Sequence, residues 1–129
     1  MALSPEQIDH FNEHGYVIAP DVVTEADLEP VEKAIAEVVD QRARRFKAEG
    51  KINDLHEDLP FERRLVELHE QDPSIIGGMD IVDLKLEAIW NFMRCPNLLD
   101  NVASLVGPAI ALNPIQHLRA KMPGKANSD

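Results

Sequence analysis

Residues 109–124 read AIALNPIQHLRAKMPG, and this stretch decides how the fold of the whole chain is interpreted. Its pattern indicates two β-strand runs that open onto a Pro-Gly turn. In the second run, His117, Arg119 and Lys121 share one face, and the apolar residues 118, 120 and 122 share the other. Such a strand needs partner strands to satisfy its backbone, whereas the sequence before it has helical patterns. The sequence therefore predicts a mainly α-helical chain with two or three short C-terminal β-strands, as the front part of a larger β-containing fold.

The composition indicates a single domain or a fragment of one. The 129 residues, 44% of them hydrophobic, allow one modest core. A formal net charge of −10 disfavours nucleic acids and anionic membranes as partners, because binding them needs clustered lysine and arginine. No apolar run approaches the roughly 20 residues of a membrane helix, and the N-terminus does not resemble a secretory signal. The single cysteine cannot form an internal disulfide. We therefore expect a cytoplasmic protein without nucleic-acid or membrane partners.

Two helix starts carry the same capping signature. Ser4-Pro5-Glu6-Gln7 predicts a serine N-cap, a proline at the first helical position and a glutamine that bonds back to the cap, and Gly15 predicts the helix end. Thr24-Glu25-Ala26-Asp27 repeats this device at the start of a long helix that runs toward Gly50. We expect residues 42–51 to form a charged end of that helix. Its apolar face is predicted to consist of Leu28, Val31, Ile35, Val38 and Val39.

The rest of the sequence predicts a loop and three shorter helices. Residues 51–60 lack a helical period and contain turn formers, so they are expected to form a surface loop. The first expected helix runs from Phe61 to the Asp72-Pro73 stop, and the third covers 97–106 before Gly107-Pro108. The second begins after Gly77-Gly78, and its apolar face consists of Ile81, Leu84, Ala88 and Trp90 or Phe92. The predicted organisation is a helical region at 3–108, the first strands at 109–124 and a tail at 125–129.

Three segments, taken in order, are similar to one protein family. Residues 3–18 contain a helix that ends at Gly15-Tyr16 and leads into a short extended segment at 16–19. Residues 95–108, CPNLLDNVASLVGP, form a helix with a Gly-Pro stop, and residues 120–124, AKMPG, are similar to a Lys-Pro-Pro-Gly stretch. In this order and spacing, the segments resemble the N-terminal portion of the phytanoyl-CoA dioxygenase family of Fe(II) and 2-oxoglutarate-dependent oxygenases.

The resemblance implies a double-stranded β-helix, or jelly roll, in which iron is held by a His-x-Asp pair and a distant second histidine. It implies hydroxylation of a small-molecule substrate with 2-oxoglutarate as cosubstrate. The family's His-x-Asp comes shortly after the Lys-Pro-Pro-Gly stretch, which here is followed only by residues 125–129. Lys121 matches the family lysine that helps to bind 2-oxoglutarate. The chain by itself is therefore expected to lack the iron ligands and to be inactive.

Two other sets of histidines suggest metal sites, and each has a plainer interpretation. His56 and Asp58 match the His-x-Asp motif and His117 lies downstream, so these three residues could provide a facial triad of iron ligands. A charged loop is nevertheless a poor place for a rigid iron site, and a solvated loop is favoured. His10 and His14 have the spacing to hold a metal from one helix face. Without a third ligand in view, an exposed polar face is favoured for them.

Four further features remain, and none has a pattern that favours a functional role. Cys95 precedes a proline without a nearby histidine, which favours a buried or half-buried structural cysteine over a nucleophile. Trp90 and Phe92 suggest the mouth of a substrate pocket, but core packing is the favoured interpretation. His69 has no evident partner in the sequence. A basic cluster suggests a phosphate or CoA site; it consists of Arg42, Arg44, Arg45 and Lys47. Acidic residues are interleaved with it, so the favoured interpretation is a group of cations that stabilise the C-terminal end of a helix.

Two functions remain open from the sequence. In the first, the chain is the N-terminal helical part of a 2-oxoglutarate-dependent dioxygenase, and the strand at 115–122 forms one wall of the substrate pocket. In the second, the chain is a non-catalytic helical interaction or dimerisation module whose terminal strand adds to a partner's sheet. The unpaired strand makes self-association through the C-terminus an expectation of both.

Overall fold

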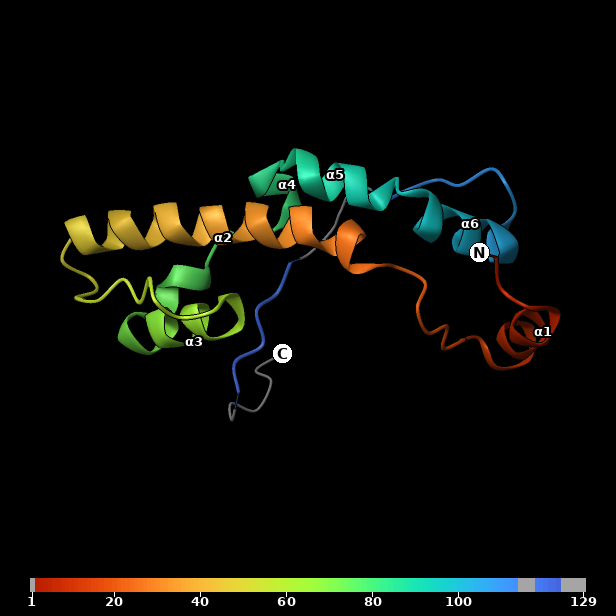
Figure 1. Ribbon diagram of the computed structural model, residues 1–129, viewed down its shortest axis with the longest axis horizontal. Helices are drawn as coiled ribbons and strands as arrows, with labels where there is room; N and C mark the ends of the chain where they lie inside the picture. The colour runs from red at the N-terminus through yellow and green to blue at the C-terminus, as the bar shows by residue number, and fades with distance from the viewer. Residues whose placement is uncertain (1, 114–117, 124–129) are drawn as a thin grey trace. The chain divides into compact units, whose positions relative to one another are not determined.

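The computed structural model describes residues 2–113 and 118–123, and these residues form helices joined by loops (Figure 1). No β-strand occurs in this described part of the chain. None of its helices has the length and apolar character that crossing a membrane requires. The predicted mainly α-helical fold is therefore confirmed. The elements are α1 (Pro5–His14), α2 (Glu25–Ala48), α3 (Phe61–Gln71), the 3₁₀ helix η1 (Pro73–Ile76), α4 (Ile81–Leu84), α5 (Glu87–Met93) and α6 (Pro96–Val106).

As far as the structure describes them, the residues group into two compact units. The first consists of Met1–Val31 and Leu86–Pro114, and the second of Glu32–Lys85 and Ile115–Asp129. Helix α2 begins in the first unit and continues through the second. Within the first unit, α1 and α5 each contact α6, and within the second, α3 contacts η1.

Local capping sets the starts of α1 and α2, as the sequence predicts. The Gln7 N–H donates to Ser4 Oγ at 3.3 Å, and the Ser4 N–H donates to Gln7 Oε1 at 2.9 Å. Helix α1 ends at Gly15, whose φ of +78° is readily adopted only by glycine. Thr24 and Asp27 make the corresponding pair of bonds at the start of α2, at 3.3 and 2.8 Å. These bonds satisfy N–H groups that a helix start otherwise leaves unpaired.

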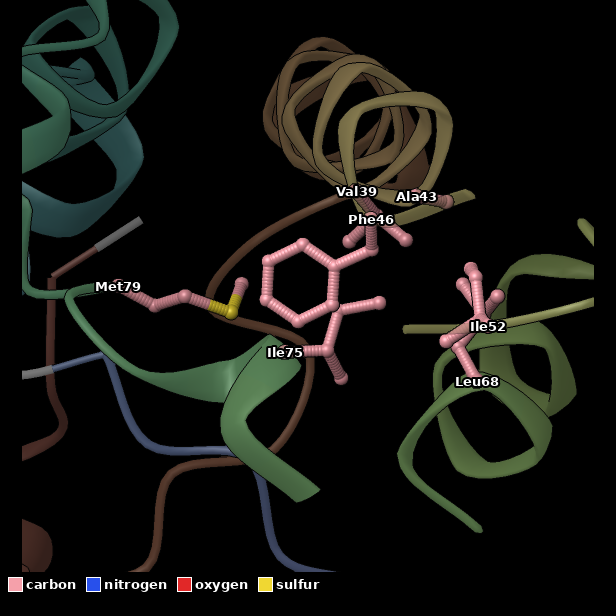
Figure 2. Packing of buried hydrophobic residues seen from close by; sticks show 7 residues of the cluster. All are labelled: Val39, Ala43, Phe46, Ile52, Leu68, Ile75 and Met79. Carbon is pink, nitrogen blue, oxygen red and sulfur yellow. The ribbon is translucent and has the colours of Figure 1, made fainter. Parts of the chain in front are cut away.

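The core of the second unit is built on the far end of α2. The buried stripe on this helix consists of Val39, Ala43 and Phe46, whereas Leu28 and Val31 are only half-buried. The predicted apolar face is therefore confirmed in part, since Val39 lies in the core and Ile35 packs against it. The prediction missed that the buried stripe continues through Ala43 and Phe46 into the charged end of the helix. Loop 51–60, α3 and η1 contribute the side chains that cover this end of α2 (Figure 2). The complete cluster is Val39, Ala43, Phe46, Ile52, Leu68, Ile75 and Met79.

The helix predicted after Gly77-Gly78 is two helices. Helix α4 ends at Leu84, Lys85 has a φ of +47°, and α5 begins at Glu87. A left-handed conformation costs a residue with a side chain about 1–2 kcal/mol. The break falls where the chain passes from the second unit to the first. No glycine or proline marks this position, so the sequence pattern predicts one continuous helix across Lys85.

The C-terminal strands stay a prediction. Residues 109–113 and 118–123 belong to neither a helix nor a strand, and 114–117 and 124–129 lie outside the described residues. Along the described segment, Leu118, Ala120 and Met122 are half-buried and Arg119 and Lys121 are exposed. This is the two-residue period that the sequence predicts. A strand is defined by a hydrogen-bonded neighbour, so alternation alone does not make one.

Candidate functional site

Lys121, the residue matched to 2-oxoglutarate binding, lies in the second unit. Its side chain is exposed, as is that of Arg119. Leu118, from the opposite face of the segment, packs against the buried cluster of this unit. The contact positions the cationic face outward, because neighbouring side chains of an extended segment alternate in direction. The segment thus presents two cations to solvent.

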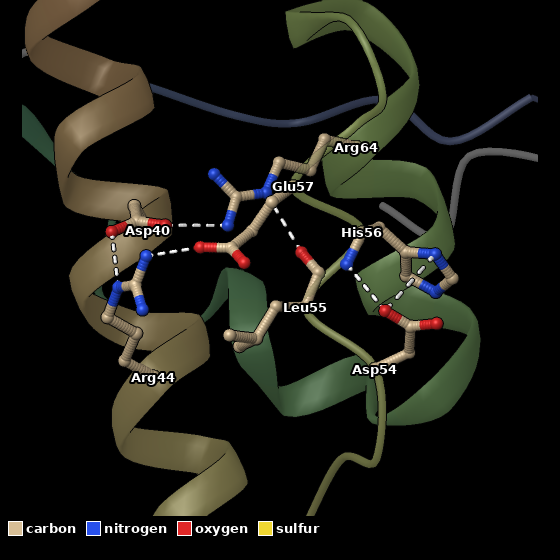
Figure 3. Close-up of polar contacts among 7 residues, drawn as sticks. All are labelled: Asp40, Arg44, Asp54, Leu55, His56, Glu57 and Arg64. Carbon is tan, nitrogen blue, oxygen red and sulfur yellow. Dashed lines mark hydrogen bonds and ion pairs between the residues drawn. The ribbon is translucent and has the colours of Figure 1, made fainter.

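The structure pairs His56 with Asp54 and shows no hydrogen bond or ion pair between His56 and Asp58. The His56 N–H donates to Asp54 Oδ1 at 2.9 Å, and its Nδ1 lies 3.9 Å from the same oxygen (Figure 3). The hydrogen bond from the His56 backbone lowers the pKa of Asp54 below its usual value. His117, the third ligand of the hypothetical iron site with His56 and Asp58, lies outside the described residues. Within the described part of the chain, no three His, Cys, Asp or Glu side chains are arranged to hold a metal ion.

His10 and His14 lie together at the end of α1, with Tyr16 beside them. The two imidazole rings are 4.4 Å apart between centroids and nearly perpendicular. The Tyr16 ring lies 5.0 Å from His10 in the same edge-to-face manner. Edge-to-face packing of this kind is favourable for aromatic rings. The histidine pair therefore has an aromatic neighbour that sequence spacing does not reveal, and it acts here as a small surface cluster.

Arg42, from the basic cluster of α2, binds another part of the second unit. The Arg42 guanidinium donates to three backbone carbonyls, those of Ile75 at 2.8 Å, Gly77, and Gly78 at 3.2 Å. Arg45 Nε lies 3.9 Å from Glu49 Oε1 in an exposed pair. The Arg42 donors are therefore committed to backbone carbonyls, whereas Arg45 and Lys47 remain exposed cations. The sequence-based interpretation of the basic cluster as helix C-terminal cations did not predict that Arg42 binds the turn after η1.

An ionic network joins α2, loop 51–60 and α3. Asp40 accepts from Arg44 Nε at 2.8 Å and from Arg64 Nη2 at 2.7 Å. Arg64 Nε also donates to the Leu55 carbonyl at 3.0 Å, and Arg44 pairs with Glu57 (Figure 3). The hydrogen bonds from Arg44 and Arg64 lower the pKa of the Asp40 carboxyl. The network therefore fixes the loop against both helices, and its members are committed to structure.

The lowered pKa of Asp40 predicts an acid-sensitive contribution to stability. A depressed folded-state pKa gives stability above the unfolded value of about 3.9, and this stability is lost as pH falls through the folded pKa. Asp40→Asn is therefore expected to destabilise the second unit at pH 7 and to flatten the loss of stability below about pH 4. Denaturant midpoints measured from pH 7 to pH 3 test this, with Asp83→Asn on α4 as the control. Equal acid profiles for Asp40→Asn and the unmodified chain would contradict it.

Gln71 is a structural residue that sequence reasoning missed. Its Oε1 accepts from the Asn53 and Asp54 N–H groups at 2.8 and 3.0 Å, and its Nε2 donates to the Asp54 carbonyl at 2.9 Å. One amide at the end of α3 thus satisfies three backbone groups of the loop. The only sequence signal is a glutamine directly before the Asp72-Pro73 helix stop, which does not specify a partner.

A cleft of about 480 Å³ lies in the first unit, between the start of α1, the start of α2 and α6. Its polar lining includes Ser4, Gln7, Thr24, Asn97 and Asn101. Asn97 of α6 donates to Asp27 at the start of α2 at 2.8 Å, whereas Asn101 donates to the Asn97 carbonyl within α6 at 2.7 Å. The cleft therefore brings together capping groups whose hydrogen bonds stabilise the fold.

Three remaining candidates have different outcomes. Trp90 is 50% exposed and lies under the Arg94 guanidinium, 5.5 Å from the ring centroid, so its predicted core packing was wrong. Ile89, the preceding residue on α5, occupies the buried position instead. Cys95 is half-buried with a free thiol at the start of α6, as predicted. His69 is buried in the second unit.

A scan against protein-family models found no matching family, and searches of curated proteins and of solved structures likewise found no match.

Proposed function

We propose that the chain is the N-terminal helical part of a non-haem iron, 2-oxoglutarate-dependent dioxygenase of the phytanoyl-CoA dioxygenase type. The proposal is supported by the order of the resembling segments together with the local structure at each. Helix α1 ends in the Gly15-Tyr16 step, α6 ends before Gly107-Pro108, and Lys121 lies on the exposed face of an alternating segment. The exposed Lys121 carries the argument, because a cosubstrate with two carboxylates needs a fixed cation near one of them.

The described residues do not provide a donor set that fits iron, so no reaction step at a metal is assigned to them. In the proposed enzyme the iron ligands follow the Lys-Pro-Pro-Gly stretch, after residues 121–124. When bound there, iron and 2-oxoglutarate supply hydroxylation of an unactivated C–H bond of a small molecule, coupled to decarboxylation of 2-oxoglutarate to succinate. The part assigned to this chain is to brace the jelly roll with helices and to hold a carboxylate at Lys121.

The gene sequence downstream of codon 129 tests the proposal directly. The expected result is an open reading frame with a His-x-Asp soon after residue 124 and a second histidine farther on. Succinate release from 2-oxoglutarate by the longer polypeptide, lost on His→Ala substitution at that motif, would support the assignment. A native stop codon directly after Asp129 would overturn it.

Lys121→Ala is expected to raise the KM for 2-oxoglutarate of the longer enzyme about tenfold to a hundredfold. The estimate follows from the loss of a charge-assisted hydrogen bond worth about 1.5–3 kcal/mol. Lys121→Arg is expected to retain part of the affinity, since it keeps the charge. Lys47→Ala on α2 provides an exposed lysine as the control. Steady-state succinate assays measure the effect, and an unchanged KM in Lys121→Ala would remove Lys121 from the cosubstrate site.

An exposed apolar segment favours a second candidate, a non-catalytic interaction module. Tyr16 is 57% exposed and Ile18 is 81% exposed, and both line a shallow groove of about 370 Å³ with His10 and Gln7. Large apolar side chains grouped on a surface are typical of contact sites. In an oxygenase this segment would be covered by the jelly roll. If the native polypeptide ends at Asp129 and binds neither iron nor 2-oxoglutarate in titrations, the interaction module is the better description.

A further inference from the structure

The segment 118–122 has the side-chain pattern of a β-strand, but no strand pairs with it among the described residues. Leu118, Ala120 and Met122 are half-buried, and Leu118 rests on the core of the second unit. Arg119 and Lys121 are exposed on the opposite face. No hydrogen bond joins the backbone of these residues to another described residue. A segment that is anchored on one face and unpaired along its backbone is a template for strand addition.

The charges on the segment select the kind of strand that pairs with it. In an antiparallel pair of two identical copies centred on Ala120, Arg119 lies opposite Lys121 on both sides. In a parallel pair in register, Arg119 faces Arg119 and Lys121 faces Lys121. Like charges directly opposite each other across two strands are destabilising, and opposite charges are stabilising. Self-association through this segment, which the sequence alone allows, is therefore disfavoured.

We infer that residues 118–122 dock against the edge strand of a β-sheet in which Asp or Glu side chains lie opposite Arg119 and Lys121. Backbone hydrogen bonds provide the attachment, and the two cross-strand ion pairs provide register and selectivity. The half-buried face keeps its contact with the second unit, because pairing along the backbone leaves both faces of the strand in place. The inference rests on the second candidate function, the non-catalytic interaction module, and is an alternative to the cosubstrate role of Lys121, since it requires neither iron nor 2-oxoglutarate.

The test uses the full chain labelled with ¹⁵N and two short synthetic peptides, one alternating valine with glutamate and the other alternating valine with lysine. The glutamate peptide is expected to shift the amide signals of residues 118–122 and to slow their hydrogen exchange. It is expected to bind about tenfold more tightly than the lysine peptide, because two cross-strand contacts change sign. The double variant Arg119→Glu, Lys121→Glu is expected to reverse this preference.

A single substitution provides a second test that needs no peptide. In the Arg119→Glu variant, two copies can pair antiparallel about Ala120. The introduced carboxylate of each copy then lies opposite Lys121 of the other copy. This variant is expected to dimerise in sedimentation experiments, whereas the unmodified chain and Arg119→Lys stay monomeric at the same concentration. Three results would each overturn the inference: equal binding of the two peptides, no response at amides 118–122, or a dimer of the unmodified chain with these amides protected. Circular dichroism of each variant verifies that the helices are retained.

Discussion

Leu68→Ala is expected to lower the free energy of unfolding of the second unit by about 2–5 kcal/mol. Leu68 is fully buried, as are Ile52 and Ile75, and it lies beside Ile52 in the cluster (Figure 2). Truncation removes apolar contacts and leaves a cavity that the surrounding helices fill only in part. Because typical domains have only about 5–15 kcal/mol of stability, this single change is a large fraction of the total.

Hydrogen exchange of the α2 amides at residues 39–46 measures this loss, since these amides exchange when the second unit opens. Leu112→Ala is the matched control, because Leu112 is 47% exposed and the same atoms are removed. The control is expected to change stability by less than about 0.5 kcal/mol. Equal losses in the two variants would show that Leu68 does not occupy the core.

Arg42→Met is expected to lower stability by about 1.5–3 kcal/mol, the range for hydrogen bonds to a charged group. Methionine fills much of the volume of the arginine stem but donates no hydrogen bond. The carbonyls of Ile75, Gly77 and Gly78 then lose their common donor, and the turn that places Met79 in the core is released from α2. Arg42→Lys is expected to recover only part of the loss, since an ammonium group lacks the planar fork of a guanidinium.

Arg63→Met is the control for Arg42. Arg63 is also an arginine on a helix of the second unit, but its side chain is 69% exposed and its pair with Glu67 has a separation of 3.8 Å. Exposed pairs of this kind contribute about 0–1 kcal/mol. Chemical denaturation followed by far-ultraviolet circular dichroism compares the variants. If Arg42→Met were no more destabilising than Arg63→Met, the bonds to the three carbonyls would carry no stability.

The helix ends were predictable from sequence because their physics is local. The Ser4 to Gln7 capping box, the Gly15 stop and the Gly107 stop each depend on residues within one helical turn. The burial alternation at 118–122 is likewise a property of neighbouring residues in an extended chain. For the candidate site, this means that the exposed face carrying Lys121 was predictable from the sequence pattern.

Tertiary structure alone decided which of several possible faces became buried. Phe46 lies among charged residues in the sequence, and its burial depends on Ile52, Leu68 and Ile75 arriving from other parts of the chain. Arg42 meets its three carbonyls across 33 to 36 residues, and Gln71 meets the loop across 17 or 18. Lys85 breaks a pattern that reads as one continuous helix. Helix caps and periodicity are set by neighbours along the chain, whereas the core and its polar clamps are set by distant segments that no local pattern specifies.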